Sequence, residues 1–91
     1  MTNEHLQIAS KLVNEVINEM NDRYASTPQA KDYCMRRMDE GTNDITIQPT
    51  HSKCGYCFDQ IIKIAEALNL HYYFEVTENL DGEPTPTMHI F

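Results

Sequence analysis

The stretch HYYFEVTENLDGEPTPTMHIF, residues 71–91, contains a complete strand–turn–strand pattern in a chain of 91 residues. Its first part, HYYFEVT at 71–77, is rich in aromatic and β-branched residues, a composition typical of a strand. The Asp-Gly pair in ENLDGE is typical of a tight turn between strands, and TPTMHIF supplies the second strand. We predict an antiparallel hairpin in which Pro84 and Pro86 mark either an edge strand or the entry of the last strand, because proline cannot donate a backbone hydrogen bond.

The segment before the hairpin predicts a strand and a helix. DITIQ at 44–48 alternates apolar and polar residues, which indicates a short strand. A helix is predicted over residues 55–69, where the apolar residues recur at helical spacing: Phe58, Ile61, Ile62, Ala65 and Leu68. A strand–helix–strand unit has a right-handed crossover, so strands 44–48 and 71–77 should run parallel. Together with the hairpin, they predict a three-stranded mixed sheet.

Two helices are predicted before this unit. The first spans residues 3–24, in which one stripe collects most of the apolar side chains: Leu6, Ala9, Val13, Val16, Ile17, Met20 and Tyr24. The second is predicted over residues 28–40, because Pro28 suits a first helical turn and Gly41 suits a helix end. The chain, residues 1–91, is thus predicted to be a single α+β domain with its helices mainly on one face of the sheet. The long apolar stripe of the first helix also makes a homodimer a candidate assembly.

The charge balance limits the classes of partner. Fourteen Asp and Glu residues stand against seven Lys and Arg, which gives a formal net charge of −7. Direct binding to nucleic acid or to an anionic membrane needs a basic surface, so neither is expected. No apolar run approaches the roughly 18 residues that span a bilayer, and the N-terminal MTNEHLQIAS has no signal-peptide pattern. With an odd count of three cysteines, a disulfide framework is not expected, and we predict a reduced, cytoplasmic protein.

The segment HSKCGYC, which starts at His51, holds the pattern of reactive side chains in this sequence. His51, Cys54 and Cys57 are spaced three residues apart, and imidazole and thiolate are ligands that Zn²⁺ prefers. A fourth ligand would come from Cys34 of the second predicted helix or from His71. The first hypothesis is therefore a zinc site whose candidate ligands are Cys34, His51, Cys54 and Cys57.

Cys54 and Cys57 also form a CxxC motif between a predicted strand and a predicted helix. A thiolate at such a position is stabilised by unsatisfied N–H groups and by the positive end of the helix dipole. The arrangement resembles the redox dithiol of thioredoxin-like proteins, and PTMHIF at 86–91 is similar to the proline and strand that face the dithiol in that family. The resemblance covers residues 44–91 and implies Cys54 as nucleophile and Cys57 as resolving thiol. The family's helix between the second and third strands, its C-terminal helix and its tryptophan before the motif have no counterpart in this sequence.

A third interpretation of the same cysteines is structural. Free cysteine is among the most buried residue types, so Cys54 and Cys57 would pack beneath the helix. The sequence has no paired carboxylates, nucleophile elbow or glycine-rich phosphate loop, so an enzymatic function would depend on this dithiol. We expect a protein that is not an enzyme and that has no cofactor, with zinc as the exception that the first hypothesis allows.

The hairpin itself is uniformly acidic. Residues 71–91 contain four Asp and Glu side chains and no Lys or Arg. This charge favours a partner with a basic surface, and the backbone groups of an edge strand can pair with a strand of that partner. The predicted partner-binding residues are Tyr73, Glu75, Glu78, Asp81 and Glu83.

These observations favour a small acidic interaction protein of the cytoplasm, a regulator or inhibitor that binds a basic surface of a partner protein through its hairpin. Compact acidic domains without catalytic residues are typical of such regulators, including those encoded by mobile elements. The alternative belongs to a different class: a thiol–disulfide redox protein or a structural zinc protein centred on Cys54 and Cys57.

Overall fold

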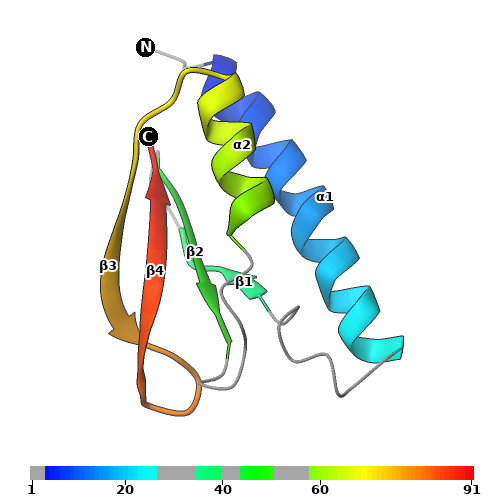
Figure 1. Ribbon diagram of the computed structural model, residues 1–91, viewed down its shortest axis with the longest axis vertical. Helices are drawn as coiled ribbons and strands as arrows, with labels where there is room; N and C mark the ends of the chain where they lie inside the picture. The colour runs from blue at the N-terminus through cyan, green and yellow to red at the C-terminus, as the bar shows by residue number, and fades with distance from the viewer. Residues whose placement is uncertain (1–3, 27–34, 40–43, 51–57) are drawn as a thin grey trace.

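The computed structural model of the protein describes residues 4–26, 35–39, 44–50 and 58–91. In these ranges the chain forms two helices and four strands, which are α1 (Glu4–Ser26), β1 (Met35–Arg37), β2 (Ile45–Pro49), α2 (Asp59–Ala67), β3 (Tyr72–Glu78) and β4 (Pro84–Ile90). Both helices lie on the same side of the sheet (Figure 1). The predicted α+β class is therefore confirmed. The first predicted helix, the strand predicted over residues 44–48, the helix predicted after it and the C-terminal hairpin are confirmed as well.

β4 lies between β2 and β3 in the sheet. The strand order is β1-β2-β4-β3, and every pair of neighbouring strands is antiparallel. β2 and β3 therefore run in the same direction, but they are not neighbours (Figure 1). This is a split β-α-β unit, in which a further strand is inserted between the two strands of the crossover. The predicted three-stranded mixed sheet is wrong: the described sheet has four strands and no parallel pair, because the hairpin returns into the gap that the crossover leaves.

The additional strand, β1, lies where the sequence predicts a helix over residues 28–40. Within that range the structure describes residues 35–39, and Met35–Arg37 pair antiparallel with β2. The Asn21 side chain of α1 accepts a hydrogen bond from the N–H of Met35 (3.1 Å) and donates one to its carbonyl oxygen (3.2 Å). This contact from a distant helix satisfies backbone groups of a strand and outweighs the local helical pattern. The prediction of a second N-terminal helix is wrong at these residues.

β4 is an interior strand, so Pro84 and Pro86 mark its entry and not a sheet edge. Its hydrogen-bonded pairs with β3 involve odd-numbered residues, because His71 and Phe91 exchange both backbone hydrogen bonds, at 3.0 and 2.9 Å, and such pairs alternate along antiparallel strands. The two prolines fall between these pairs, so they remove no hydrogen bond from the hairpin. On the other side, the register of β2 with β4 ends at Met88, before the prolines are reached. The first half of β4 thus pairs, among the described strands, with β3 alone.

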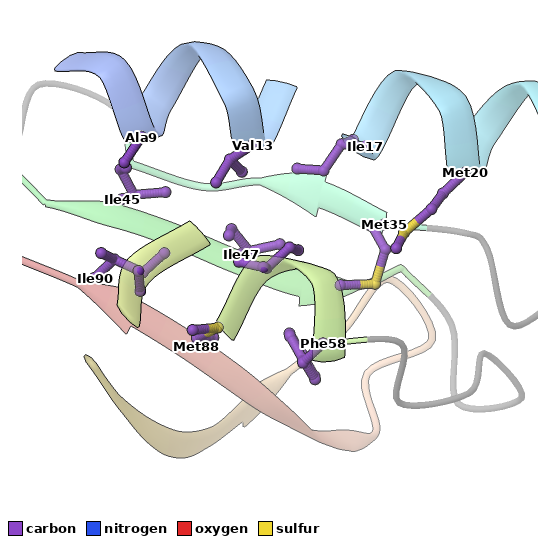
Figure 2. Close-up of a cluster of buried hydrophobic side chains, with 12 residues drawn as sticks. Ala9, Val13, Ile17, Met20, Met35, Ile45, Ile47, Phe58, Met88 and Ile90 are labelled. Carbon is purple, nitrogen blue, oxygen red and sulfur yellow. The ribbon is translucent and has the colours of Figure 1, made fainter. Parts of the chain in front are cut away.

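The helices and the sheet enclose one apolar core (Figure 2). Each helix contributes residues three or four apart and each strand contributes alternate residues. The buried apolar side chains are Ala9, Val13, Ile17 and Met20 of α1, Met35 of β1, Ile45 and Ile47 of β2, Phe58, Ile61 and Ala65 at α2, and Met88 and Ile90 of β4. Much of the apolar stripe predicted for the first helix is thus buried within the chain, while Ile8 and Leu12 remain exposed. The structure describes a single chain, so the homodimer stays a prediction.

α2 ends in a left-handed turn that leads directly into β3. Asn69 has a φ of 57°, its N–H bonds to the carbonyl oxygen of Glu66 at 3.1 Å, and the N–H of Leu70 bonds to that of Ala65 at 2.9 Å. These two bonds form a Schellman motif with asparagine at the position where glycine is commonest. Because the motif reverses the chain within two residues, β3 can begin at Tyr72.

Candidate functional site

The turn of the hairpin is held by one buried side chain. Asn79 is 6% exposed, and its Oδ1 accepts hydrogen bonds from the N–H groups of Asp81 (2.8 Å) and Glu83 (3.2 Å). The N–H of Gly82 bonds to the carbonyl oxygen of Asn79 at 3.0 Å. Gly82 has a φ of 75°, which glycine adopts without steric cost. The predicted turn at the Asp-Gly pair is confirmed, and it holds the backbone of two predicted binding residues in place.

β3 presents different chemistry on its two faces. Side chains alternate along a strand, and the register aligns Tyr72 with Ile90 and Phe74 with Met88. The helix-side face carries Tyr72, Phe74 and Val76, and the opposite face, which we call the distal face, carries Tyr73, Glu75 and Thr77. Phe74 meets the ring of Phe58 edge-on, with the centroids 5.1 Å apart. Phe74 and Val76 nevertheless remain 42% and 71% exposed, because β3 is the outermost strand and lies less covered than the core.

Tyr73, Glu75 and His89 form a compact group on the distal face. Oε1 of Glu75 lies 2.6 Å from Nε2 of His89, a contact that becomes an ion pair when the imidazole is protonated. The Tyr73 ring stacks on the imidazole, with centroids 4.7 Å apart, and meets the Phe91 ring at 5.8 Å. Nδ1 of His89 lies 3.3 Å from the hydroxyl of Thr46, so the imidazole is held from both sides. Two predicted binding residues are thus brought together around a histidine whose role the sequence did not indicate.

The other three predicted binding residues, Glu78, Asp81 and Glu83, lie at the tip of the hairpin, and all are exposed. The tip is tied to the sheet by a backbone hydrogen bond of 2.9 Å from the N–H of Leu80 to the carbonyl oxygen of Thr50. The structure therefore divides the predicted site into two parts. One part lies in the middle of β3 and the other at the turn.

Gln48 of β2 is fully buried on the distal face and joins its own strand to the other three. Its Oε1 accepts two hydrogen bonds, of 2.8 and 2.6 Å, from the guanidinium of Arg36 in β1. Its Nε2 donates to the hydroxyl of Thr77 (2.9 Å), to the carbonyl oxygen of Glu78 (3.2 Å) and to the hydroxyl of Thr87 (3.3 Å). The two threonine hydroxyls are also hydrogen-bonded to each other. Sequence reasoning missed this network, because its members come from all four described strands and share no local pattern.

The two edges of the sheet are protected to different degrees. β1 has three residues, two of them arginines, and Asn21 occupies the outward backbone groups of Met35; shortness, charge and coverage are common means of blocking strand addition. β3 has seven residues in unbroken register with β4 and contains no Lys, Arg or Pro. Because odd-numbered residues of β3 bond to β4, the N–H and C=O groups of Tyr72, Phe74 and Val76 point away from the sheet. These groups, which we call the outer edge of β3, face no strand among the described residues.

The basic side chain of Arg37 is used within the fold. Its Nε donates to Oδ1 of Asp39 at 2.6 Å, and its Nη1 donates to the hydroxyl of Ser10 (3.0 Å) and to Oδ1 of Asn14 (2.7 Å) in α1. Burial raises the pKa of the Asp39 carboxyl, but hydrogen bonds from the Arg37 side chain and from the N–H of Thr46, with the charge of Arg37, outweigh burial and lower the pKa below its ordinary value. Arg37 therefore serves to dock β1 onto α1.

The predicted zinc ligands Cys34, His51, Cys54 and Cys57 lie outside the described residues, and so does the CxxC pair of the redox interpretation. Both hypotheses stay predictions. Within the described ranges, no three His, Cys, Asp or Glu side chains are grouped in a way that could hold a metal ion.

No family model, curated protein or solved structure matches the chain. Neither described helix is long and apolar enough to cross a lipid bilayer.

Proposed function

We propose that the protein is a small cytoplasmic interaction protein, a regulator or inhibitor that binds a basic surface of a partner protein through the β3–β4 hairpin. The observation that carries the proposal is the single sign of the hairpin's exposed charge. Its four carboxylates, those of Glu75, Glu78, Asp81 and Glu83, are exposed, and residues 71–91 contain no Lys or Arg. Charge of one sign on a surface steers encounter with a surface of the opposite sign and disfavours other partners.

The rigidity of the hairpin supports a binding role. Asn79 fixes the turn through its two side-chain hydrogen bonds, and Gln48 fixes the end of β3 through Thr77. A surface that is already ordered loses little conformational entropy when a partner binds, so more of the interaction energy appears as affinity. On this proposal the protein acts by occupying a surface of its partner and not by catalysis.

The proposal is tested by isolating partners from the cells that encode the chain, with the wild-type protein and with the E75Q/E78Q/E83Q variant as baits. We expect the variant to lose the partner. With the purified partner, we expect the wild-type affinity to fall about tenfold or more between low and high salt, because screening weakens charge attraction.

The matched control is E4Q/E15Q/D22N, which removes three exposed acidic groups from α1 and leaves the hairpin unchanged. This control should bind as the wild type does. Equal loss of binding in both triple variants would show that net charge matters and the hairpin does not. Affinity that does not change with salt would contradict the proposal directly.

A further inference from the structure

We infer that the partner contributes an extended segment with alternating apolar and basic side chains, which adds as a strand to the outer edge of β3. The inference rests on the proposed function and adds the form and chemistry of the bound segment. It depends on three features of β3: its backbone, its helix-side face and its distal face.

The backbone of β3 is prepared for strand addition. Tyr72, Phe74 and Val76 direct their N–H and C=O groups outward, and main-chain hydrogen bonds to such groups supply the affinity in strand addition. The opposite edge of the sheet lacks this opportunity, because Asn21 already bonds both backbone groups of Met35. In Figure 1, β3 lies at the margin of the sheet with its outer side turned away from both helices.

The helix-side face of β3 requires apolar side chains in the added strand. Val76 is 71% exposed and Phe74 is 42% exposed, and they lie two residues apart on the same face. Residues that are directly opposite in paired strands pack their side chains together. Apolar residues opposite Phe74 and Val76 would therefore bury both side chains and extend the contact between Phe74 and Phe58.

The distal face of β3 requires basic side chains at the alternate positions. Glu75 presents a half-exposed carboxylate, and Tyr73 presents an exposed aromatic ring beside it. A Lys or Arg in the added strand can pair with the carboxylate and lie against the tyrosine ring. A second copy of this chain is disfavoured as the occupant, because it carries the same net charge of −7 and its own β3 would bring further acidic residues to the edge.

The test uses a peptide of four Lys-Val repeats and two forms of it that are methylated on backbone nitrogens. One form is methylated on the backbone nitrogen of every lysine, and the other on the backbone nitrogen of every valine. In an added strand, only every second N–H points towards β3. We therefore expect one methylated form to lose binding about tenfold or more and the other to keep it. Equal binding, or equal loss, by the two methylated forms would overturn strand addition.

Amide hydrogen exchange gives the second measurement on the same samples. The amide protons of Tyr72, Phe74 and Val76 should exchange at least about tenfold more slowly when the Lys-Val peptide is bound. The amides of Tyr73 and Glu75 already bond to β4, so they should change less. Uniform slowing over both sets, or no slowing of the outer set, would contradict the inference.

Two variants and one further peptide separate this inference from the proposed function. Val76→Pro removes an outward N–H and leaves the β4 ladder intact, so it should abolish binding of the Lys-Val peptide, whereas Val76→Thr should retain most of it. If Val76→Pro does not fold, the methylated peptides still decide the question.

Octalysine that binds as tightly as the Lys-Val peptide would overturn the inference and leave the basic-surface proposal standing. If neither peptide binds, the charge attraction on which the inference and the proposed function depend is absent. A stable dimer that protects the same three amides without peptide would assign the edge to a second copy.

Discussion

The carboxylate of Glu75 and the imidazole of His89 lie side by side on neighbouring strands, with 2.6 Å between Oε1 and Nε2. The same imidazole carries the stacked ring of Tyr73, so the group keeps a fixed orientation on the distal face. Glu75 therefore differs from the acidic residues of the turn. Its charge is held in one place by an internal partner, whereas Glu78 and Glu83 present charge at the tip of the hairpin.

The first prediction concerns His89. His89→Ala removes the support of both Tyr73 and Glu75, and we expect a loss of about 1 kcal/mol in the free energy of unfolding. His89→Gln keeps a polar group that can reach Glu75 and should lose less. Urea unfolding of the two variants measures the difference. Equal stability of His89→Ala and the wild type would show that the contacts of His89 with Tyr73 and Glu75 do not stabilise the fold.

The second prediction concerns the hairpin turn. Asn79→Ala leaves the N–H groups of Asp81 and Glu83 without the acceptor that they now share, so we expect a loss of about 1–2 kcal/mol in the free energy of unfolding. Asn79→Asp keeps an acceptor oxygen at the same place and should retain most of the stability. Denaturant unfolding would contradict this account if the alanine and aspartate variants proved equally unstable.

The third prediction concerns the end of α2. Asn69 has a positive φ of 57°, a conformation that costs a residue with a branched Cβ about 1–2 kcal/mol. Asn69→Val should therefore unfold at lower temperature than the wild type. Asn69→Gly should be at least as stable, because glycine adopts this conformation freely. A valine variant as stable as the glycine variant would mean that the turn has another backbone geometry in solution.

The fourth prediction concerns the buried amide of Gln48. Gln48→Leu removes the acceptor that the Arg36 guanidinium now uses and the donor that Gln48 supplies to Thr77 and Thr87, so we expect a loss of about 2–3 kcal/mol in the free energy of unfolding. Gln60→Leu, at an exposed position of α2, is the matched control and should change stability little. Faster amide exchange in β3 of the Gln48 variant would show that the network anchors this strand.

The fifth prediction is a pH dependence that comes from Asp39. The pKa of its carboxyl is lower in the folded protein than the ordinary value of 3.8. The ionised carboxylate therefore stabilises the fold above about that pH, and this contribution is lost as the pH falls through the lower pKa of the folded state. We expect Asp39→Asn to be less stable than the wild type by about 1 kcal/mol at neutral pH, since the group is partly exposed to solvent.

The difference between Asp39→Asn and the wild type should shrink in acid. Unfolding curves recorded at neutral pH and well below pH 3.8 give the comparison. A difference that stays constant over this range would show that the ionisation of Asp39 does not contribute to stability.

The parts of the fold that the sequence predicts are those with local causes. α1 follows from an apolar stripe at helical spacing, and the hairpin follows from alternating residues on both sides of an Asp-Gly turn. β1 was not predictable in this way, because its strand conformation depends on Asn21 of α1. The interior place of β4 was also not predictable, because the two prolines are compatible with an edge strand or with the entry of a strand unless the register is known.

The features of the candidate site likewise divide into those with local causes in the sequence and those that depend on distant contacts. The acidic character of the hairpin and the shared face of Tyr73 and Glu75 follow from composition and from alternation along a strand. His89 and Gln48 were missed as members of the site, because each acts through side chains on other strands. Such contacts depend on which strands are neighbours, and the split β-α-β order could not be derived from local patterns.

The insertion of β4 between β2 and β3 also constrains the order in which the chain folds. β3 and β4 are joined by a short turn, so they can pair early and at little loop-closure cost. The inner neighbour of β2 is β4, which lies much further along the chain, so this pairing closes a longer loop than the hairpin does. We expect substitutions in the hairpin turn to slow folding and substitutions in β2 mainly to speed unfolding.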